Sequence, residues 1–177
     1  MLKSFARTLT AVTVAASGAL VAQEKNAALT DPQIAMIAVV AGNVDIETGK
    51  LAVKKAHDKR VKEFAELMVR DHSSVNEKAA ALAKKLGVTP EATPTSKSLK
   101  SDGDKEMAKL KKLTGAEFDK AYVDNEVAYH DAVIGVLKKT LIPNTSNAEL
   151  KSLLESATPV FESHLEHAKM IQASLKK

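Results

Sequence analysis

The chain has 177 residues, of which 45% are hydrophobic and 27% are charged, with a formal net charge of +4. Aromatic residues make up only 3% and tryptophan is absent, so neither a base-stacking surface for nucleic acid nor an aromatic sugar cleft is expected. Cysteine is also absent, which excludes a disulfide framework and a thiolate metal site.

The N-terminus has the layout of a secretory signal peptide. Lys3 and Arg7 precede an uncharged apolar stretch that is shorter than the roughly 20 residues needed to cross a membrane as a helix. We expect a signal peptide over residues 1–22, with cleavage after Ala19 or Ala22. The mature chain would then be periplasmic or secreted, without stable membrane insertion.

Removal of this leader leaves 24 basic and 22 acidic residues, a net charge of only +2. Such a balance gives no electrostatic case for a nucleic-acid partner. The remaining length suits one domain, which we predict to be a helical bundle over residues 30–176.

The first predicted helix begins at Thr30, where Thr30 and Gln33 form a capping box and Pro32 lies in the first turn. Apolar or small residues then recur at spacings of three and four, which is the pattern of an amphipathic helix. This seam consists of Ile34, Ile37, Ala41, Val44, Thr48 and Leu51.

A break near His57 leads to a second predicted helix, which Asp58 caps and Gly87 ends. Its seam consists of Val61, Ala65, Met68, His72, Val75, Ala79, Leu82 and Leu86. Residues 88–113 form a predicted crossover, because their Thr-Pro-Glu-Ala-Thr-Pro run interrupts helical structure. A short helix is expected within it, from Asp104 to Leu113.

The third predicted helix starts at a Thr114–Glu117 capping box, and Pro143 with Asn144 ends it. The fourth starts at a Ser146–Glu149 capping box. Their two seams consist of Val123, Val127, His130, Ile134, Leu137 and Leu141, and of Leu154, Ala157, Phe161, His164, Ala168, Ile171 and Leu175.

These elements predict an all-α fold, a four-helix bundle with a long crossover between the second and third long helices. No segment alternates with the period of a β-strand. Because a long crossover makes the second and third helices parallel, mid-helix residues of both should lie at a similar height.

Three histidines occupy seam positions that otherwise hold apolar residues: His72, His130 and His164. Each lies near the middle of its helix, so the three imidazoles are expected in one layer. Asp45 lies at a similar height on the first helix. We predict a transition-metal site formed by these four residues, because imidazole nitrogen and carboxylate oxygen are common ligands of such ions.

Secondary candidate ligands are Met68, Asp71, Tyr122 and His167, which lie beside the histidine seams. Copper or zinc is expected before iron, because few carboxylates face inward. The alternative is a structural or interaction protein, in which the histidines and aspartates form a buried hydrogen-bond network without metal.

No nucleophile elbow, glycine-rich phosphate loop or reactive cysteine is present in the sequence. We therefore expect metal handling or envelope stress protection rather than catalytic turnover. A redox enzyme that uses Tyr122 has no independent support in the sequence.

Three segments together resemble a family of exported bacterial proteins of unknown function within the ferritin-like superfamily. They are the M-x-x-D-H segment ending at His72, the F-D-x-x-Y segment at Phe118 that leads to His130, and the P-x-x-x-x-H segment ending at His164. The resemblance implies a ferritin-like fold and the marked positions Asp45, Met68, Asp71, His72, Asp119, Tyr122, His130, Pro159 and His164.

Asp45 stands where that family more often has glutamate. Ferritin-like di-iron proteins also carry glutamate three residues before each ligand histidine, whereas this chain has Val69, Val127 and Phe161 there. The sequence therefore disfavours a ferroxidase or a di-iron oxygenase.

Overall fold

The computed structural model describes residues 28–175, and within this range all regular structure is helical. The elements are α2 (Asp31–Lys55), α3 (Lys59–Leu86), α4 (Pro94–Lys112), α5 (Gly115–Val136), the π-helical segment η2 (Leu137–Leu141), α6 (Ile142–Asn144) and α7 (Ala148–Leu175). The predicted signal peptide and both cleavage positions lie outside the described residues. In the described part, no helix has the length and apolar character needed to span a membrane.

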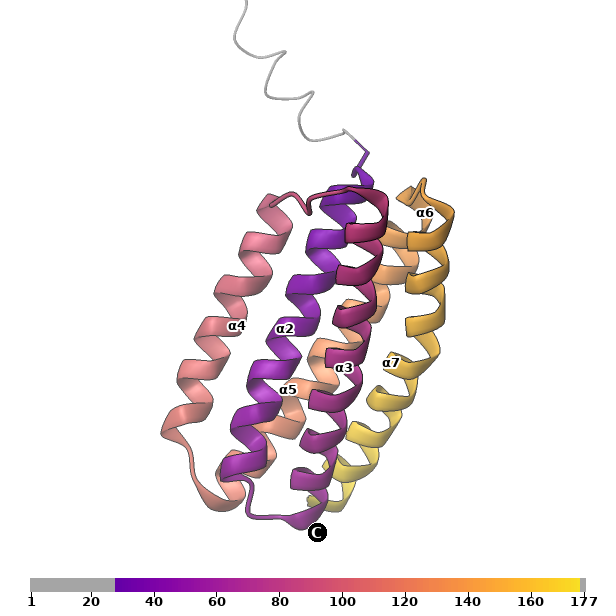
Figure 1. Ribbon diagram of the computed structural model, residues 1–177. Helices are drawn as coiled ribbons and strands as arrows, with labels where there is room; N and C mark the ends of the chain where they lie inside the picture. The colour runs from indigo at the N-terminus through magenta and orange to yellow at the C-terminus, as the bar shows by residue number, and fades with distance from the viewer. Residues whose placement is uncertain (1–27, 176–177) are drawn as a thin grey trace, which may run out of the picture.

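The long helices lie side by side, and each runs in the direction opposite to the one before it in the sequence (Figure 1). α4 carries the chain back along the length of the bundle, so that α3 and α5 run in the same direction (Figure 1). α4 packs mainly on α2, whereas α5 packs mainly on α7. This arrangement brings the middle of α3, α5 and α7 to one level.

The helix predicted within the crossover is longer than expected, because α4 begins at Pro94 rather than at Asp104. Thr93 caps it: its hydroxyl accepts from the Ser96 amide at 3.0 Å, and the Ser96 hydroxyl oxygen accepts from the Thr93 amide at 2.9 Å. Proline is favourable in a first turn, where its missing N–H has no helical partner. Thr93 and Pro94, which belong to the run predicted to interrupt helical structure, therefore form the start of this helix.

The helix ends agree with the sequence at some positions and differ at others. Asp58 caps α3 by accepting from the Arg60 amide at 2.8 Å, and Gly87 ends α3 with a left-handed φ of 64°. The fourth helix is capped by Asn147 instead of Ser146, since Asn147 Oδ1 accepts from the Leu150 amide at 3.0 Å. The amide of Ser146 donates to Asp31 instead.

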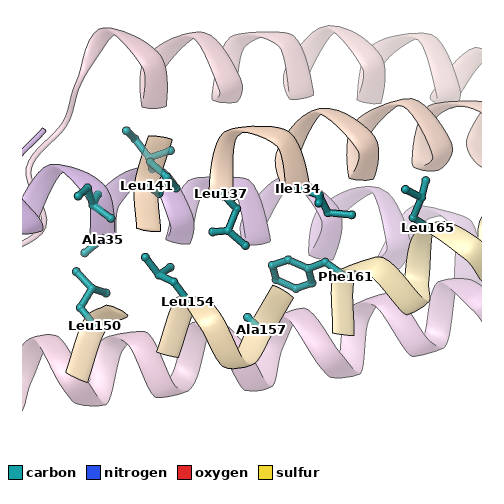
Figure 2. Packing of buried hydrophobic residues seen from close by; sticks show 11 residues of the cluster. Ala35, Ile134, Leu137, Leu141, Leu150, Leu154, Ala157, Phe161 and Leu165 are labelled. Atoms are coloured by element: carbon teal, nitrogen blue, oxygen red, sulfur yellow. The ribbon is translucent and has the colours of Figure 1, made fainter. Parts of the chain in front are cut away.

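Two apolar clusters fill the bundle along its length. One cluster lies toward the start of α2 and the end of α5, and its side chains from α2, α5, η2 and α7 point toward one another (Figure 2). The other lies toward the opposite end and contains Phe64, Met68, Phe118 and Tyr122. A layer of buried polar side chains separates the two clusters.

Candidate metal centre

This polar layer contains the three histidines that occupy seam positions. His72 on α3, His130 on α5 and His164 on α7 are each no more than 2% exposed. Their ring centroids form a nearly equilateral triangle with separations of 5.4, 5.5 and 5.5 Å. One ring nitrogen of each lies within 4.8 Å of the others, so the three imidazoles converge on one point.

The local sequence explains why these side chains face inward. Met68, one helical turn before His72, belongs to the cluster at one end, and Ile134, one turn after His130, belongs to the cluster at the other. Because residues four apart share a helix face, packing of these neighbours directs both imidazoles toward the axis of the bundle.

His164 is oriented by a carboxylate from another helix. Its Nε2 lies 3.0 Å from Asp71 Oδ2, and Arg70 Nε donates to Asp71 Oδ1 at 2.8 Å. Partial burial raises the pKa of Asp71, but the hydrogen bonds from Arg70 and His164 outweigh it and lower this pKa below its usual value. The ionised carboxylate accepts, so Nε2 carries the proton and Nδ1 presents its lone pair.

His130 is oriented by its own helix. Its Nδ1 lies 3.0 Å from the carbonyl oxygen of Glu126. Because a carbonyl only accepts, Nδ1 is the protonated nitrogen, and Nε2 presents its lone pair.

Neither ring nitrogen of His72 has a hydrogen-bond partner among the described residues. Asp45 Oδ2 is 3.5 Å from Nε2, which is too long for a strong hydrogen bond. The ring instead stacks on Phe161, with the centroids 4.8 Å apart and an interplanar angle of 11°. His72 is thus held in position by an aromatic contact while its polar atoms stay available.

The pKa values of His72 and His164 keep the lone pairs of these two rings free at neutral pH. Burial, with the neighbouring His130 and His164, lowers the pKa of His72 to about 3. Burial also lowers the pKa of His164, although the hydrogen bond to Asp71 opposes this effect. Neutral imidazole is the form that binds a metal ion.

Asp45 and Glu126 form a buried pair of carboxyl groups next to the histidines. Burial raises the pKa of Glu126 to about 8, although Asp45 and Tyr122 partly lower it. Burial and the charge of Glu126 raise the pKa of Asp45 well above its usual value. A ligand oxygen of each carboxyl and a ring nitrogen of His130 lie within 4.8 Å of one another, so this pair adjoins the histidine triangle.

Glu126 is the residue that sequence reasoning left out of the predicted site. It is fully buried, and no hydrogen bond of normal geometry reaches either of its carboxyl oxygens from the described residues. The sequence feature that identifies Glu126 is its spacing. It lies four residues after Tyr122 and four before His130, so the three residues share one helix face.

The secondary candidates lie at different distances from the triangle. Asp71 contacts it directly through His164, and Tyr122 lies in the adjoining cluster with its hydroxyl unpartnered among the described residues. Met68 packs in that same cluster. His167 does not join the triangle, because its ring packs against Phe64 with centroids 5.2 Å apart.

Asp119, a marked position in the family resemblance, lies away from the histidines. Its two carboxyl oxygens accept from the backbone amides of His57 and Asp58, at 3.0 and 2.7 Å. Asp119 therefore ties the start of α5 to the α2–α3 turn.

The donor set fits a metal ion on chemical grounds. Buried polar atoms normally find hydrogen-bond partners, yet within residues 28–175 each of the three converging histidines carries an unpartnered ring nitrogen. The unpartnered nitrogens are His72 Nδ1 and Nε2, His130 Nε2 and His164 Nδ1. One ring nitrogen of each histidine can face the common point, and Asp45, whose Oδ1 is also unpartnered, lies beside it with Glu126 and His130. The other ring nitrogens of His130 and His164 are hydrogen-bonded to a carbonyl and a carboxylate, as is usual for histidines that bind a metal ion.

Comparison with known proteins places the chain by family and by fold. The family model described as "Domain of unknown function (DUF4142)" matches residues 16–171. No curated protein matches the sequence significantly.

Two solved structures share the helical fold at low sequence identity. One is a DUF305 protein from Streptomyces coelicolor that carries the description of a secreted protein, with 15% identity, a TM-score of 0.70, and coverage of 81% of this chain and 92% of that chain. The other is CopM in the Cu(II)-bound form, with 14% identity, a TM-score of 0.64, and coverage of 82% and 98%.

Proposed function

The chain belongs to the DUF4142 family, and we propose that it binds one divalent transition-metal ion at the point where His72, His130 and His164 converge. The observation that carries this proposal is the set of buried and unpartnered imidazole nitrogens from three helices. We propose a role in metal handling or stress protection in the cell envelope.

The expected ligands follow from the hydrogen bonds. His130 would bind through Nε2 and His164 through Nδ1, because their other nitrogens carry protons that are donated to Glu126 and Asp71. Asp45 is the proposed fourth ligand, since its carboxyl lies beside His72 and its Oδ1 has no hydrogen-bond partner in the described part of the chain. Three imidazoles and one carboxylate suit Cu(II) or Zn(II) better than an oxygen-preferring ion.

The fold neighbour supports copper as the first ion to test. CopM is a bundle of similar architecture whose structure holds Cu(II). At 14% identity this likeness shows the shared fold, so the ligands proposed here rest on the geometry of this chain. The ferritin-like bundle with a crossover remains our proposal for the wider relationship, with α4 as the crossover helix.

A purely structural network is the alternative function, and the Asp71–His164 hydrogen bond favours it. Such a network should satisfy its own members, because each unpartnered buried polar group costs about 1–3 kcal/mol. His72 has no hydrogen-bond partner for either ring nitrogen among the described residues. A bound cation supplies a partner that the network lacks.

Elemental analysis of the full chain purified from its native cell envelope tests the proposal, together with titration of metal-free protein by Cu(II) and Zn(II). We expect one ion per chain and a rise in melting temperature that a chelator reverses, because a ligand of the folded state stabilises it by about 2.7 kcal/mol at 100 times its Kd.

His72→Ala should lose this thermal response, whereas His57→Ala is the matched control, because His57 is an exposed histidine at the α2–α3 turn. Equal responses in the two variants, or no stoichiometric metal in the wild type, would contradict the proposal. Nitrogen hyperfine structure in the electron paramagnetic resonance spectrum of the Cu(II) form gives an independent readout of imidazole ligation.

A further inference from the structure

A cavity of about 420 Å³ lies beside the histidine layer, toward the α2 N-terminus. Its walls come from α2, α3, α4, α5, η2 and α7, and most of its lining side chains are aliphatic. Its volume falls within the range of small-molecule sites, roughly 300–1,000 Å³. Leu137, Leu154 and Phe161, which face one another in Figure 2, are among its walls.

The polar residues that line the cavity differ in burial. Asp45 and His72 are the buried polar side chains of its lining, and both carry atoms without a hydrogen-bond partner among the described residues. Thr95 and Asp102 of α4 and Ala132 of α5 are lining residues that are exposed, so the cavity opens between α4 and α5.

The backbone at the wall departs from regular α-helix. α5 passes into the π-helical segment η2, and Leu137 and Leu141 of that segment are both buried and both line the cavity. π-Helical turns inside α-helices occur frequently at functional sites, and this one widens the helix next to the cavity.

The charges of the lining restrict the ligand. Asp102 and Glu106 carry the negative charges of the lining, and no lysine or arginine from the described part of the chain lines the cavity. An anion such as a fatty-acid carboxylate would enter an apolar space without a counterion, which is strongly unfavourable. An apolar body with an uncharged polar end complements both the aliphatic walls and the unpartnered atoms.

We propose that this cavity binds one small uncharged amphiphile, with its apolar body between the aliphatic walls and its hydroxyl or carbonyl end against His72 and Asp45. This inference goes beyond metal binding, and it is tested on the metal-free protein because His72 and Asp45 are also proposed metal ligands. The site would take a neutral alcohol or ketone of medium chain length in preference to the corresponding acid.

Calorimetric titration of metal-free protein at neutral pH with octanol and with octanoate tests the charge requirement. We expect saturable binding of one octanol per chain and binding of octanoate that is weaker by about tenfold or more. Absence of saturable octanol binding, or tighter binding of octanoate, would overturn the proposal.

Two neighbouring alanines on α3 give a matched pair of variants. Ala79 lines the cavity, whereas Ala80 is exposed and does not line it. Ala79→Phe fills the space and should weaken octanol binding by about tenfold or more, while Ala80→Phe should leave it unchanged. Equal octanol affinity in both variants would show that octanol does not bind in this cavity and would overturn the proposal.

If Ala79→Phe does not fold, nuclear magnetic resonance of the methyl groups of the wild-type protein provides the test. On addition of octanol, the methyl signals of Leu99, Leu137 and Leu141 should shift, because these residues line the cavity. Those of Val61 and Leu110, in the opposite cluster, should not. Shifts confined to the second set, or spread equally over both, would overturn the proposal.

Discussion

Asp71 on α3 accepts a hydrogen bond from Nε2 of His164 on α7 across the bundle, with a separation of 3.0 Å. This contact joins residues 93 positions apart in the sequence and determines which nitrogen of His164 faces the two other histidines. Arg70 holds the carboxylate from its solvent side. The orientation of one proposed ligand therefore depends on a residue that is not itself in the triangle.

Replacement of Asp71 should weaken metal binding without removing a ligand. Asp71→Ala removes the carboxylate that accepts from Nε2 of His164, so the proton is no longer held on that nitrogen. Loss of a hydrogen-bond partner of a ligand histidine typically lowers metal affinity by about 10–100-fold. Asp71→Asn should have a smaller effect, because its amide oxygen still accepts from Nε2. Competition with a chromophoric chelator measures both Kd values. Asp102→Asn, on exposed α4, is the control; an unchanged Kd in Asp71→Ala would contradict this role.

Acid should destabilise the metal-free protein through His72. Its pKa of about 3 in the folded state lies below the roughly 6.5 of an unfolded histidine, so the unfolded chain binds more protons between these values. The stability that comes from keeping His72 neutral is present above pH ~6.5 and is lost as the pH falls toward 3. Urea unfolding between pH 4 and pH 7 measures this loss. His72→Phe should show a shallower pH dependence over that range, and an identical slope would contradict the assignment.

Glu126 should have the opposite pH dependence. Its folded pKa of about 8 lies above the roughly 4.3 of an unfolded glutamate, so its contribution to stability is greatest at acid pH and is lost as the pH rises through 8. Glu126→Gln keeps the shape and removes the ionisation. We expect this variant, without metal, to melt at a higher temperature than the wild type at pH 8 and at a similar temperature at pH 4. A lower melting temperature at pH 8 would show that the ionised carboxylate is favourable.

Asp119 should matter for folding rather than for metal binding. Its carboxylate accepts two backbone amides of the α2–α3 turn, and hydrogen bonds to a charged group contribute about 1.5–3 kcal/mol each. Asp119→Ala should lower the free energy of unfolding by at least ~1.5 kcal/mol. Denaturant unfolding measures this change, and the metal Kd of the folded fraction should remain as in the wild type. A weakened Kd at unchanged stability would place Asp119 in the site.

Local sequence patterns account for the four longest helices and for the faces that they bury. Periodic apolar residues and capping residues such as Asp58 and Gly87 act within a few positions of the chain, so they could be recognised without any tertiary information. The same periodicity identifies His72, His130 and His164 as inward-facing, because they share a helix face with the apolar residues of each seam. The length of α4 does not follow from local pattern in the same way: the Thr-Pro run predicts a helix break, whereas Pro94 after the capping Thr93 starts the helix.

Tertiary structure alone decided what surrounds the histidines. Only the packing of α3 against α7 brings Asp71 to His164, and only the packing of α5 into the core buries Glu126 beside Asp45 and raises its pKa. The cavity likewise depends on how far α4 stands from α5, a distance that no local pattern encodes. Short-range periodicity specifies which face of each helix is buried, whereas the distances between faces arise from the packing of all side chains together.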